Sequence, residues 1–502
     1  MNRTFSLVSI IILSLVFNIS AASSETKNLR YVKKGVDENN IKIVSFNYEF
    51  KNGTCEIKLT CEAPEDMGYS FFNPPEGDKI MFFKPEGLKK GVNAINLEFP
   101  EKSYNDLTEK ILTFSFRFKA ADKEAYLVTN FGDHKLPFDD GTNEITSLPV
   151  YDEKSDKLWQ VDLRGADVSK INVADRFNDL IHADFDTDTR WPSKLPEKFD
   201  PAKIMQLGKM PGLNLVRLHE KGITAKGVSI AVIDQKLLRD HDEYAGRIKH
   251  YEEIKCSQSE PQMHSAAVVS LAAGKTVGAA PQADIYYIAT TFGTSEGDKN
   301  FDMNFTPLAE AINKILDINL KLPKPEKIRV ISVSVGWMKN SKGYEDVMKA
   351  AERAKKDGVF LISTSLDEVY GFEIYGLGRT PLSDPDDVNS YMPGIFWSSD
   401  FYKYPERFSK PMLLVPMDSR TYAGHSHKSQ YSFNSEGGLS WAVPYAAGVY
   451  ALMCQVKPDL TPEIFWKAAL DTGSEITLKK DGKEIKFGKI LNPVKLKDAL
   501  AR

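Results

Sequence analysis

The chain has 502 residues, of which 42% are hydrophobic and 27% are charged, a composition that is ordinary for a globular protein with a sizeable core. Its 65 basic and 69 acidic residues give a net charge of −4. With charges so nearly balanced, no strong field draws the chain to nucleic acid or to anionic lipid, so we expect neither as a partner.

Residues 1–22 have the features of a signal peptide. Arg3 supplies a positive charge, and Leu7–Phe17 form an apolar stretch too short to span a bilayer comfortably. Ser20-Ala21-Ala22 then offers the small residues of a cleavage site. The alternative is a buried N-terminal helix. The signal predicts a secreted or extracytoplasmic chain with no membrane association once the signal is removed.

Residues 23–145 contain short runs in which apolar and polar side chains alternate. These runs are Ile41–Tyr48, Cys55–Cys61, Ile95–Phe99 and Ile111–Phe118. Clusters of Gly, Pro, Asn and Asp separate them, which predicts an all-β, sandwich-like N-terminal domain. Cys55 and Cys61 would lie at the two ends of one strand, too far apart to bond to each other, and we expect core thiols. The domain could be a partner-binding module, a spacer or a removable pro-segment.

Residues 146–205 are polar and rich in aspartate, and we expect a linker or connector at the surface. The alternating aspartates of His182–Pro192 are faintly similar to a calcium loop, but the later Gly and Glu of an EF-hand are missing. No CxxC or HxxxH spacing occurs in the chain. We therefore expect no metal and no cofactor, with structural calcium left as an alternative that has no assigned ligands.

From residue 206 to residue 502, short apolar runs alternate with helical segments. The predicted strands are Val228–Ile233, Ile285–Ala289, Val330–Val335 and Val359–Ser363, and the predicted helices are Thr306–Leu320 and Glu345–Lys356. Continuous apolar strands that alternate with helices predict an α/β domain, built as a doubly wound parallel sheet. Such sheets place functional groups at the carboxyl ends of their strands.

Three polar residues stand where chemistry is favoured. Asp234 ends an apolar strand, His264 opens an apolar helix, and Ser440 follows glycines at the start of a helix that is apolar on nearly every side. A helix N-terminus supplies free N–H groups and a positive dipole end, which favour negative charge near the serine oxygen. Taken singly, each residue has a structural explanation as a cap, a turn or a core residue.

Together, these segments resemble the subtilase family of serine peptidases over roughly residues 206–475. The motifs that carry the resemblance are the strand ending at Asp234, the His264 helix with Gly278-Ala279-Ala280-Pro281 after it, the serine segment Gly437–Gly448, and Pro458-Asp459-Leu460-Thr461-Pro462. The order Asp, His, Ser is that of subtilases. An α/β-hydrolase would need a histidine after its serine, and none follows Ser440.

The resemblance implies a subtilisin-like sheet and a secreted serine endopeptidase that hydrolyses peptide bonds in a protein or peptide substrate. His264 would take the Ser440 proton, and Asp234 would orient the imidazole and stabilise its charged form. By the same resemblance, Ser334, Val335 and Gly336 would pair with the substrate backbone and border the main specificity pocket. Nothing in the sequence sets the oligomeric state.

The sequence departs from the family pattern around these residues. Gln235-Lys236 follows the aspartate, Ser265 follows the histidine, and Leu439 and Trp441 flank the serine. Counting from Gly358-Val359, the position of the oxyanion donor falls on Asp367. An ionised carboxylate there would repel an oxyanion, and only a buried, protonated one could donate to it. The alternative function is therefore a catalytically weak or inactive pseudo-peptidase that acts as an extracellular protein-binding module.

Overall fold

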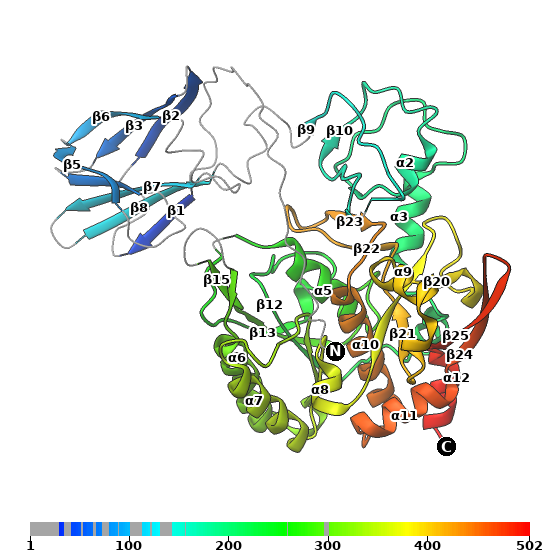
Figure 1. The fold of residues 1–502 in the computed structure, drawn as a ribbon. Coiled ribbons are helices and arrows are strands. Elements are labelled where there is room, and N and C mark those ends of the chain that lie inside the picture. The colour runs from blue at the N-terminus through cyan, green and yellow to red at the C-terminus, as the bar shows by residue number, and fades with distance from the viewer. Residues whose placement is uncertain are drawn as a thin grey trace. The chain divides into compact units, whose positions relative to one another are not determined.

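The computed structural model describes residues 30–34, 42–51, 54–63, 67–72, 80–88, 90–100, 113–120, 123–130, 143–155, 157–258, 260–295 and 301–502. The predicted signal peptide lies outside these residues. The chain divides into two compact units, Met1–Asn143 and Glu144–Arg502 (Figure 1). Each unit is considered by itself.

The first unit contains two antiparallel sheets, one with the strand order β1-β8-β7-β4-β5 and one with the order β2-β3-β6. The strands are β1 (Arg30–Lys34), β2 (Lys42–Lys51), β3 (Thr54–Ala63), β4 (Met67–Phe72), β5 (Ile80–Leu88), β6 (Gly91–Pro100), β7 (Thr113–Ala120) and β8 (Lys123–Asn130). Strands β2, β3, β6 and β7 confirm the described parts of the four predicted runs, whereas Ile41, Ile111 and Leu112 lie outside the described residues. Cys61 on β3 is buried and carries a free thiol.

The second unit is built on a five-stranded sheet in which every pairing is parallel, with the order β13-β14-β12-β17-β18. Its strands are β12 (Ser229–Asp234), β13 (Ile248–Glu253), β14 (Asp284–Ala289), β17 (Ile328–Val333) and β18 (Phe360–Ser363). The α/β class and the parallel sheet were therefore correctly predicted from the Val- and Ile-rich runs. Strand order reverses around β12, and ligands bind beyond the carboxyl ends of strands at such a point.

Helices cover both faces of this sheet (Figure 1). Ile230 and Val232 of β12 join the apolar cluster that contains helices α5 (Met263–Ala273) and α10 (Leu439–Val456). Ala231 and Ile233 join the cluster of α6 (Thr306–Lys321) and α7 (Tyr344–Lys356). Successive side chains of a strand point to opposite faces, so a strand covered on both sides must be apolar throughout.

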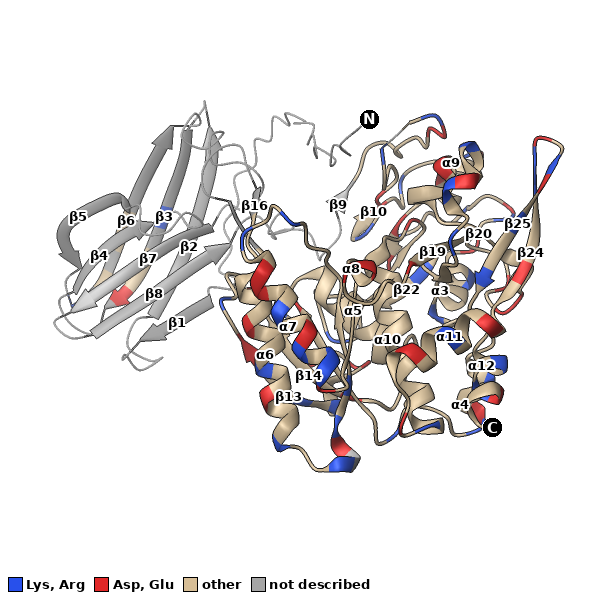
Figure 2. Ribbon diagram, turned by 60° about the horizontal axis from the view of Figure 1, so that its bottom comes forward, with Lys and Arg blue, Asp and Glu red and all other residues tan. Residues whose placement is uncertain are grey.

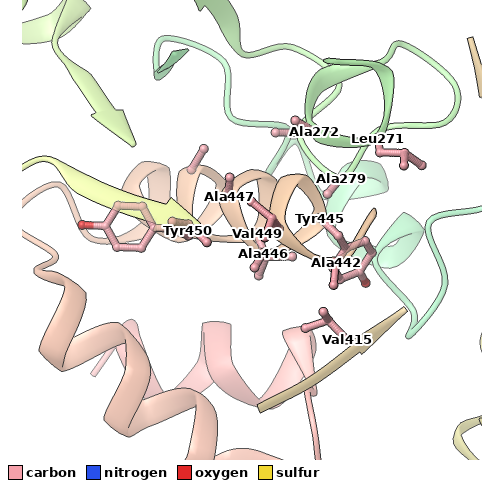
Figure 3. Packing of buried hydrophobic residues seen from close by; sticks show 14 of the residues in the cluster. Leu271, Ala272, Ala279, Val415, Ala442, Tyr445, Ala446, Ala447, Val449 and Tyr450 are labelled. Carbon is pink, nitrogen blue, oxygen red and sulfur yellow. The ribbon is translucent and has the colours of Figure 1, made fainter. Parts of the chain in front are cut away.

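The helices on the two faces of the sheet differ in how many charged residues they carry. Helices α6 and α7 carry acidic and basic residues, whereas α10 carries none (Figure 2). By length and composition α10 could cross a membrane, yet 78% of it is buried inside the protein. It lies between Ala272 and Ala279 on one side and Val415 on the other (Figure 3). Helix α10 is therefore the core helix of this unit.

Smaller sheets and helices complete the unit. A mixed sheet has the order β20-β19-β21-β25-β24, and a three-stranded sheet has the order β11-β23-β22. The remaining elements are β9 (Asn143–Glu144), β10 (Ala166–Asp167), α2 (Phe177–Ile181), β11 (Phe185–Asp186), α3 (Pro201–Lys209), α4 (Val216–Glu220), η1 (Ala245–Arg247), β15 (Gly293–Ser295), β16 (Phe301–Met303), η2 (Lys324–Glu326), α8 (Leu366–Tyr370), β19 (Ile374–Arg379), η3 (Val388–Ser390), β20 (Tyr391–Pro393), α9 (Ile395–Lys403), η4 (Pro405–Phe408), β21 (Leu413–Pro416), β22 (Arg420–Ala423), β23 (Tyr431–Asn434), α11 (Pro462–Thr472), β24 (Ser474–Lys480), β25 (Lys483–Ile490) and α12 (Pro493–Leu500).

The aspartate-rich segment is not the surface connector that its polarity suggested. Phe185 and Asp186 form β11, which pairs with β23, and both are buried. Asp184 is also buried and accepts hydrogen bonds from the side chain of Asn434 and the backbone of Ser435. The prediction was wrong here because these carboxylates face backbone and amide donors from a distant part of the chain rather than water.

Candidate functional site

Asp234 and His264 form a hydrogen-bonded pair at the carboxyl edge of the parallel sheet. Asp234 is the last residue of β12, and its side chain is only 2% exposed. Nδ1 of His264 lies 2.8 Å from Oδ1 and 3.0 Å from Oδ2 of this carboxylate. An ionised carboxylate can only accept, so Nδ1 carries the hydrogen and Nε2 is left as the basic nitrogen of the neutral ring.

The entry to α5 fixes where the imidazole points. His264 is the second residue of the helix, and the N–H of Gln262 before it donates to the carbonyl of Lys236 at 2.9 Å. Oγ of Ser265 donates to the same carbonyl at 2.6 Å. The helix start is thus joined to the loop that follows β12. Ser265, which departs from the family pattern, has this anchoring role.

The charge on Asp234 raises the basicity of His264. Burial of the imidazole by itself lowers its pKa, but the buried carboxylate and its hydrogen bond outweigh this, and the pKa of His264 is raised above its usual value of 6.5. The ring is still 28% exposed. It is therefore a base that remains reachable from solvent.

Ser440 lies in the first turn of α10, and Pro444 explains its surroundings. A proline has no N–H, so the carbonyl of Ser440 cannot receive the usual helical hydrogen bond from position 444. Oγ of Ser334 donates to that carbonyl instead, at 2.9 Å. In return, Oγ of Ser440 donates to the carbonyl of Ser334 at 3.2 Å. The two serines thus join the end of β17 to the start of α10.

The structure brings Ser440 near His264 without joining them. The rings of His264 and Trp441, the residue after Ser440, have centroids 5.6 Å apart. Among the described residues, however, no hydrogen bond links His264 to Ser440, whose hydroxyl is directed to Ser334. The Ser440 hydroxyl is held by one side-chain hydrogen bond, and rotation about χ1 would redirect it.

The start of α10 presents unused donors beside the serine. Gly438 caps the helix, and the N–H of Trp441 bonds back to its carbonyl at 2.8 Å. Within the described part of the chain, the N–H groups of Leu439 and Ser440 have no hydrogen-bond partner. Free N–H groups at the positive end of a helix form a favourable site for a developing negative charge.

The segment Ser334-Val335-Gly336 directly follows β17 and is half-buried. The carbonyl of Val335 accepts from the N–H of Thr364 at 3.3 Å, so this residue is used internally. Neither the N–H nor the C=O of Gly336 has a partner among the residues described. A side chain at Gly336 would meet Oγ1 of Thr364 at 2.6 Å, which explains the glycine. An added peptide strand could bond to this edge.

Asp367, the predicted oxyanion position, lies in the short helix α8 and is exposed. The structure therefore does not place a buried carboxyl at this position. No hydrogen bond joins it to Ser440 among the described residues. The residues that do contact the segment after β17 are Thr364 and Ser365, and Ser365 accepts from the N–H of Trp337 at 2.9 Å.

Sequence reasoning missed Asp418, which is buried beneath the serine loop. Its carboxylate accepts from the N–H of Gly437 at 2.8 Å and from the N–H of Ile395 at 2.9 Å. Burial raises the pKa of this carboxyl to about 7, against the effect of the two hydrogen bonds. The signal was available, because Asp418 follows the apolar run Leu413–Met417 much as Asp234 follows its own strand.

The described residues contain no group of three or more His, Cys, Asp or Glu side chains placed to hold a metal ion. The chemistry available at the sheet edge is that of a carboxylate, an imidazole, a hydroxyl and free backbone N–H groups.

Fold and site together define an α/β protein with a carboxylate–imidazole pair at a parallel sheet edge and a serine at a neighbouring helix N-terminus. No protein-family model matches the chain. A solved structure of the prenylagaramide maturation protease PagA is similar over 57% of this chain and 98% of that chain, with a TM-score of 0.40 and 17% sequence identity. Membership of the subtilase family stays a prediction from the motifs.

Proposed function

We propose that this chain is a secreted serine endopeptidase of subtilisin-like type, with Asp234, His264 and Ser440 as its catalytic residues. The observation that carries the proposal is the hydrogen-bonded Asp234–His264 pair beside the helix start that bears Ser440. A carboxylate that orients an imidazole next to a serine hydroxyl is the arrangement that activates a serine nucleophile.

The proposed reaction begins when the Ser440 hydroxyl leaves Ser334 and turns to Nε2 of His264. His264 takes the proton as Oγ attacks the carbonyl carbon of a peptide bond. The tetrahedral intermediate then expels the amine, which receives that proton from His264, and an acyl-enzyme remains. Water, deprotonated by His264, hydrolyses the ester and restores Ser440.

The oxyanion would be held chiefly by backbone rather than by a side chain. The unpartnered N–H of Ser440 at the helix N-terminus is the donor that the geometry favours. The free N–H and C=O of Gly336 are suited to pair with the substrate backbone. Asp367 is exposed and makes no hydrogen bond to Ser440 among the described residues, so it has no part in the proposed reaction.

Labelling of the full chain with a fluorophosphonate probe tests the proposal. Ser440 should be labelled in the parent, and labelling should vanish in Ser440→Ala and fall sharply in His264→Ala. Ser409→Ala, which removes an exposed hydroxyl elsewhere, is the matched control and should label normally. Absence of labelling in a folded parent would rule the peptidase out.

The alternative of a pseudo-peptidase that binds proteins is favoured by one observation, the bond of the Ser440 hydroxyl to Ser334 instead of His264. Under this alternative, the parent binds peptides at the Gly336 edge but is neither labelled nor able to cleave them. The same labelling experiment, combined with peptide-binding measurements, separates the two functions.

A further inference from the structure

An exposed aromatic pair lies next to the serine loop and has no role in the chemistry described so far. Trp159 and Phe396 are each 48% exposed, and their rings pack edge to face with centroids 6.1 Å apart. They come from distant parts of the sequence, the segment before the parallel sheet and the start of α9. Large aromatic side chains such as Trp and Phe are enriched at binding interfaces.

The pair is close to Ser440. A ring atom of Phe396 lies 3.6 Å from the position that a Cβ would take at Gly438. Gly438 precedes Ser440 by two residues, so their Cα atoms are at most about 7.6 Å apart. A peptide in extended form advances about 3.3 Å per residue. A substrate held at Ser440 would therefore reach the aromatic pair within a few residues of the scissile bond.

The backbone of Trp159 indicates that its position serves a purpose. Its φ is 53°, in the left-handed region that a bulky residue rarely adopts. Glu436 holds it there, because the N–H of Trp159 donates to Oε2 of Glu436 at 2.8 Å and its indole N–H donates to the Glu436 carbonyl at 3.0 Å. Strain that the surroundings maintain in this way is concentrated at functional sites.

Both rings are also tied to the loop that leads to the serine. Glu436, which holds Trp159, lies four residues before Ser440. Asp418 accepts from the N–H of Ile395, next to Phe396, and from the N–H of Gly437. Trp159 is therefore bonded to Glu436 of the nucleophile loop, and Asp418 joins that loop to the start of α9 beside Phe396.

We infer that Trp159 and Phe396 form a substrate-specificity site, which selects peptides with a large apolar side chain within a few residues of the bond that is cut. This inference rests on the proposed peptidase function. Two exposed ring faces offer an apolar side chain contact and removal from water, and the shared loop places that contact at a fixed distance from Ser440. The occupant is the substrate itself, since the surface is continuous with the loop that carries the nucleophile.

A peptide series tests the inference. Each peptide carries Phe or Ala at one position near the scissile bond, and the quantity measured is the ratio of kcat/KM for the Phe peptide to that for the Ala peptide. At one position we expect a ratio of roughly tenfold or more in the parent. Trp159→Gly, which removes the ring and suits the left-handed backbone, and Phe396→Ala should each lower this ratio towards one.

Leu320→Ala is the matched control, because Leu320 is a large apolar residue that is 65% exposed at the end of α6. Its ratio should equal that of the parent. If Ser440 is labelled by the fluorophosphonate but both aromatic variants keep the parent ratio, the surface serves another partner and the inference is overturned alone. If the parent neither labels nor cleaves, the proposed function falls, and the inference with it.

Discussion

Helices α5 and α10 are the two buried helices of the same face of the sheet, yet they present their site residues differently. His264 at the start of α5 is already paired with Asp234, whereas Ser440 at the start of α10 is bonded to Ser334. The Asp234–His264 pair is thus formed in the structure, while under the proposed function the Ser440 hydroxyl would have to leave Ser334. The difference arises because Pro444 removes a helical donor and draws Ser334 to the start of α10.

Asp234→Asn tests the Asp234–His264 pair and should have the largest effect. Losing the carboxylate leaves the imidazole in the wrong tautomer, and kcat should fall by about 10⁴. The neutral base is the active form, so activity is lost as pH falls through the His264 pKa. That pKa is raised above 6.5 with Asp234 present. In the variant, the acidic limb of the residual pH–rate profile should therefore move to lower pH.

Asp284→Asn removes a half-exposed carboxylate at the start of β14 and serves as the control. It should leave kcat and the pH profile unchanged. A kcat within tenfold of the parent for Asp234→Asn would show that the pair is only structural.

Gly448→Ala tests the contact between the two helices. An added Cβ would lie 2.6 Å from the carbonyl oxygen of Ala272 on α5 and 2.7 Å from Cβ of Ala279. Because backbone on one side cannot yield, we expect a loss of about 1–3 kcal/mol in the free energy of unfolding, measured with urea. Gly246→Ala, where an added Cβ meets nothing within 4 Å, should be neutral. Equal stabilities of the two variants would contradict the close packing.

Asp418→Asn compares how the two helix starts are held. The α5 start is tied by neutral groups, whereas the loop before α10 depends on a carboxyl whose pKa is raised to about 7 by burial. A raised carboxyl pKa means that the folded state binds the proton more tightly, so stability falls as pH rises from about 4 to about 7. Between pH 5 and pH 7, the contribution is on the order of 2 kcal/mol.

The Asn variant should lose this part of the pH dependence in urea unfolding at pH 5 and pH 7. Asp184, whose pKa is raised to about 8 by burial, contributes with the same sign in both proteins and cancels in the comparison. Asp317→Asn, at the exposed surface of α6, should keep the pH dependence of the parent's unfolding free energy. If the unfolding free energy of Asp418→Asn changes between pH 5 and pH 7 as much as that of the parent, the Asp418 carboxyl does not titrate between these pH values.

Ser334→Ala has the smallest expected effect. It tests the contact between Ser334 and Ser440 at the start of α10. It leaves the Ser440 carbonyl without a donor, because Pro444 cannot supply one. We expect a loss of about 1–2 kcal/mol in unfolding free energy, with a decrease in kcat, since the helix start is less firmly held. Ser409→Ala should change neither quantity. If Ser334→Ala has the same unfolding free energy and the same kcat as Ser409→Ala, the Ser334–Ser440 contact has no role in placing Ser440.

The sequence by itself determined the parts of this protein that repeat a simple period. Apolar runs such as Val228–Ile233 gave the strands of the parallel sheet, and helical spacing gave α6 and α7. The positions of Asp234, His264 and Ser440 at the ends of such elements also followed, because strand and helix boundaries are local properties of the chain.

Only the tertiary structure decided which of these residues meet. It paired Asp234 with His264, turned Ser440 to Ser334 and left Asp367 exposed. It also buried the aspartates near residue 185 and placed Trp159 beside Glu436, 277 positions away. Whether a carboxylate is buried, paired or open to water depends on groups that are distant in sequence, and no local pattern contains that information.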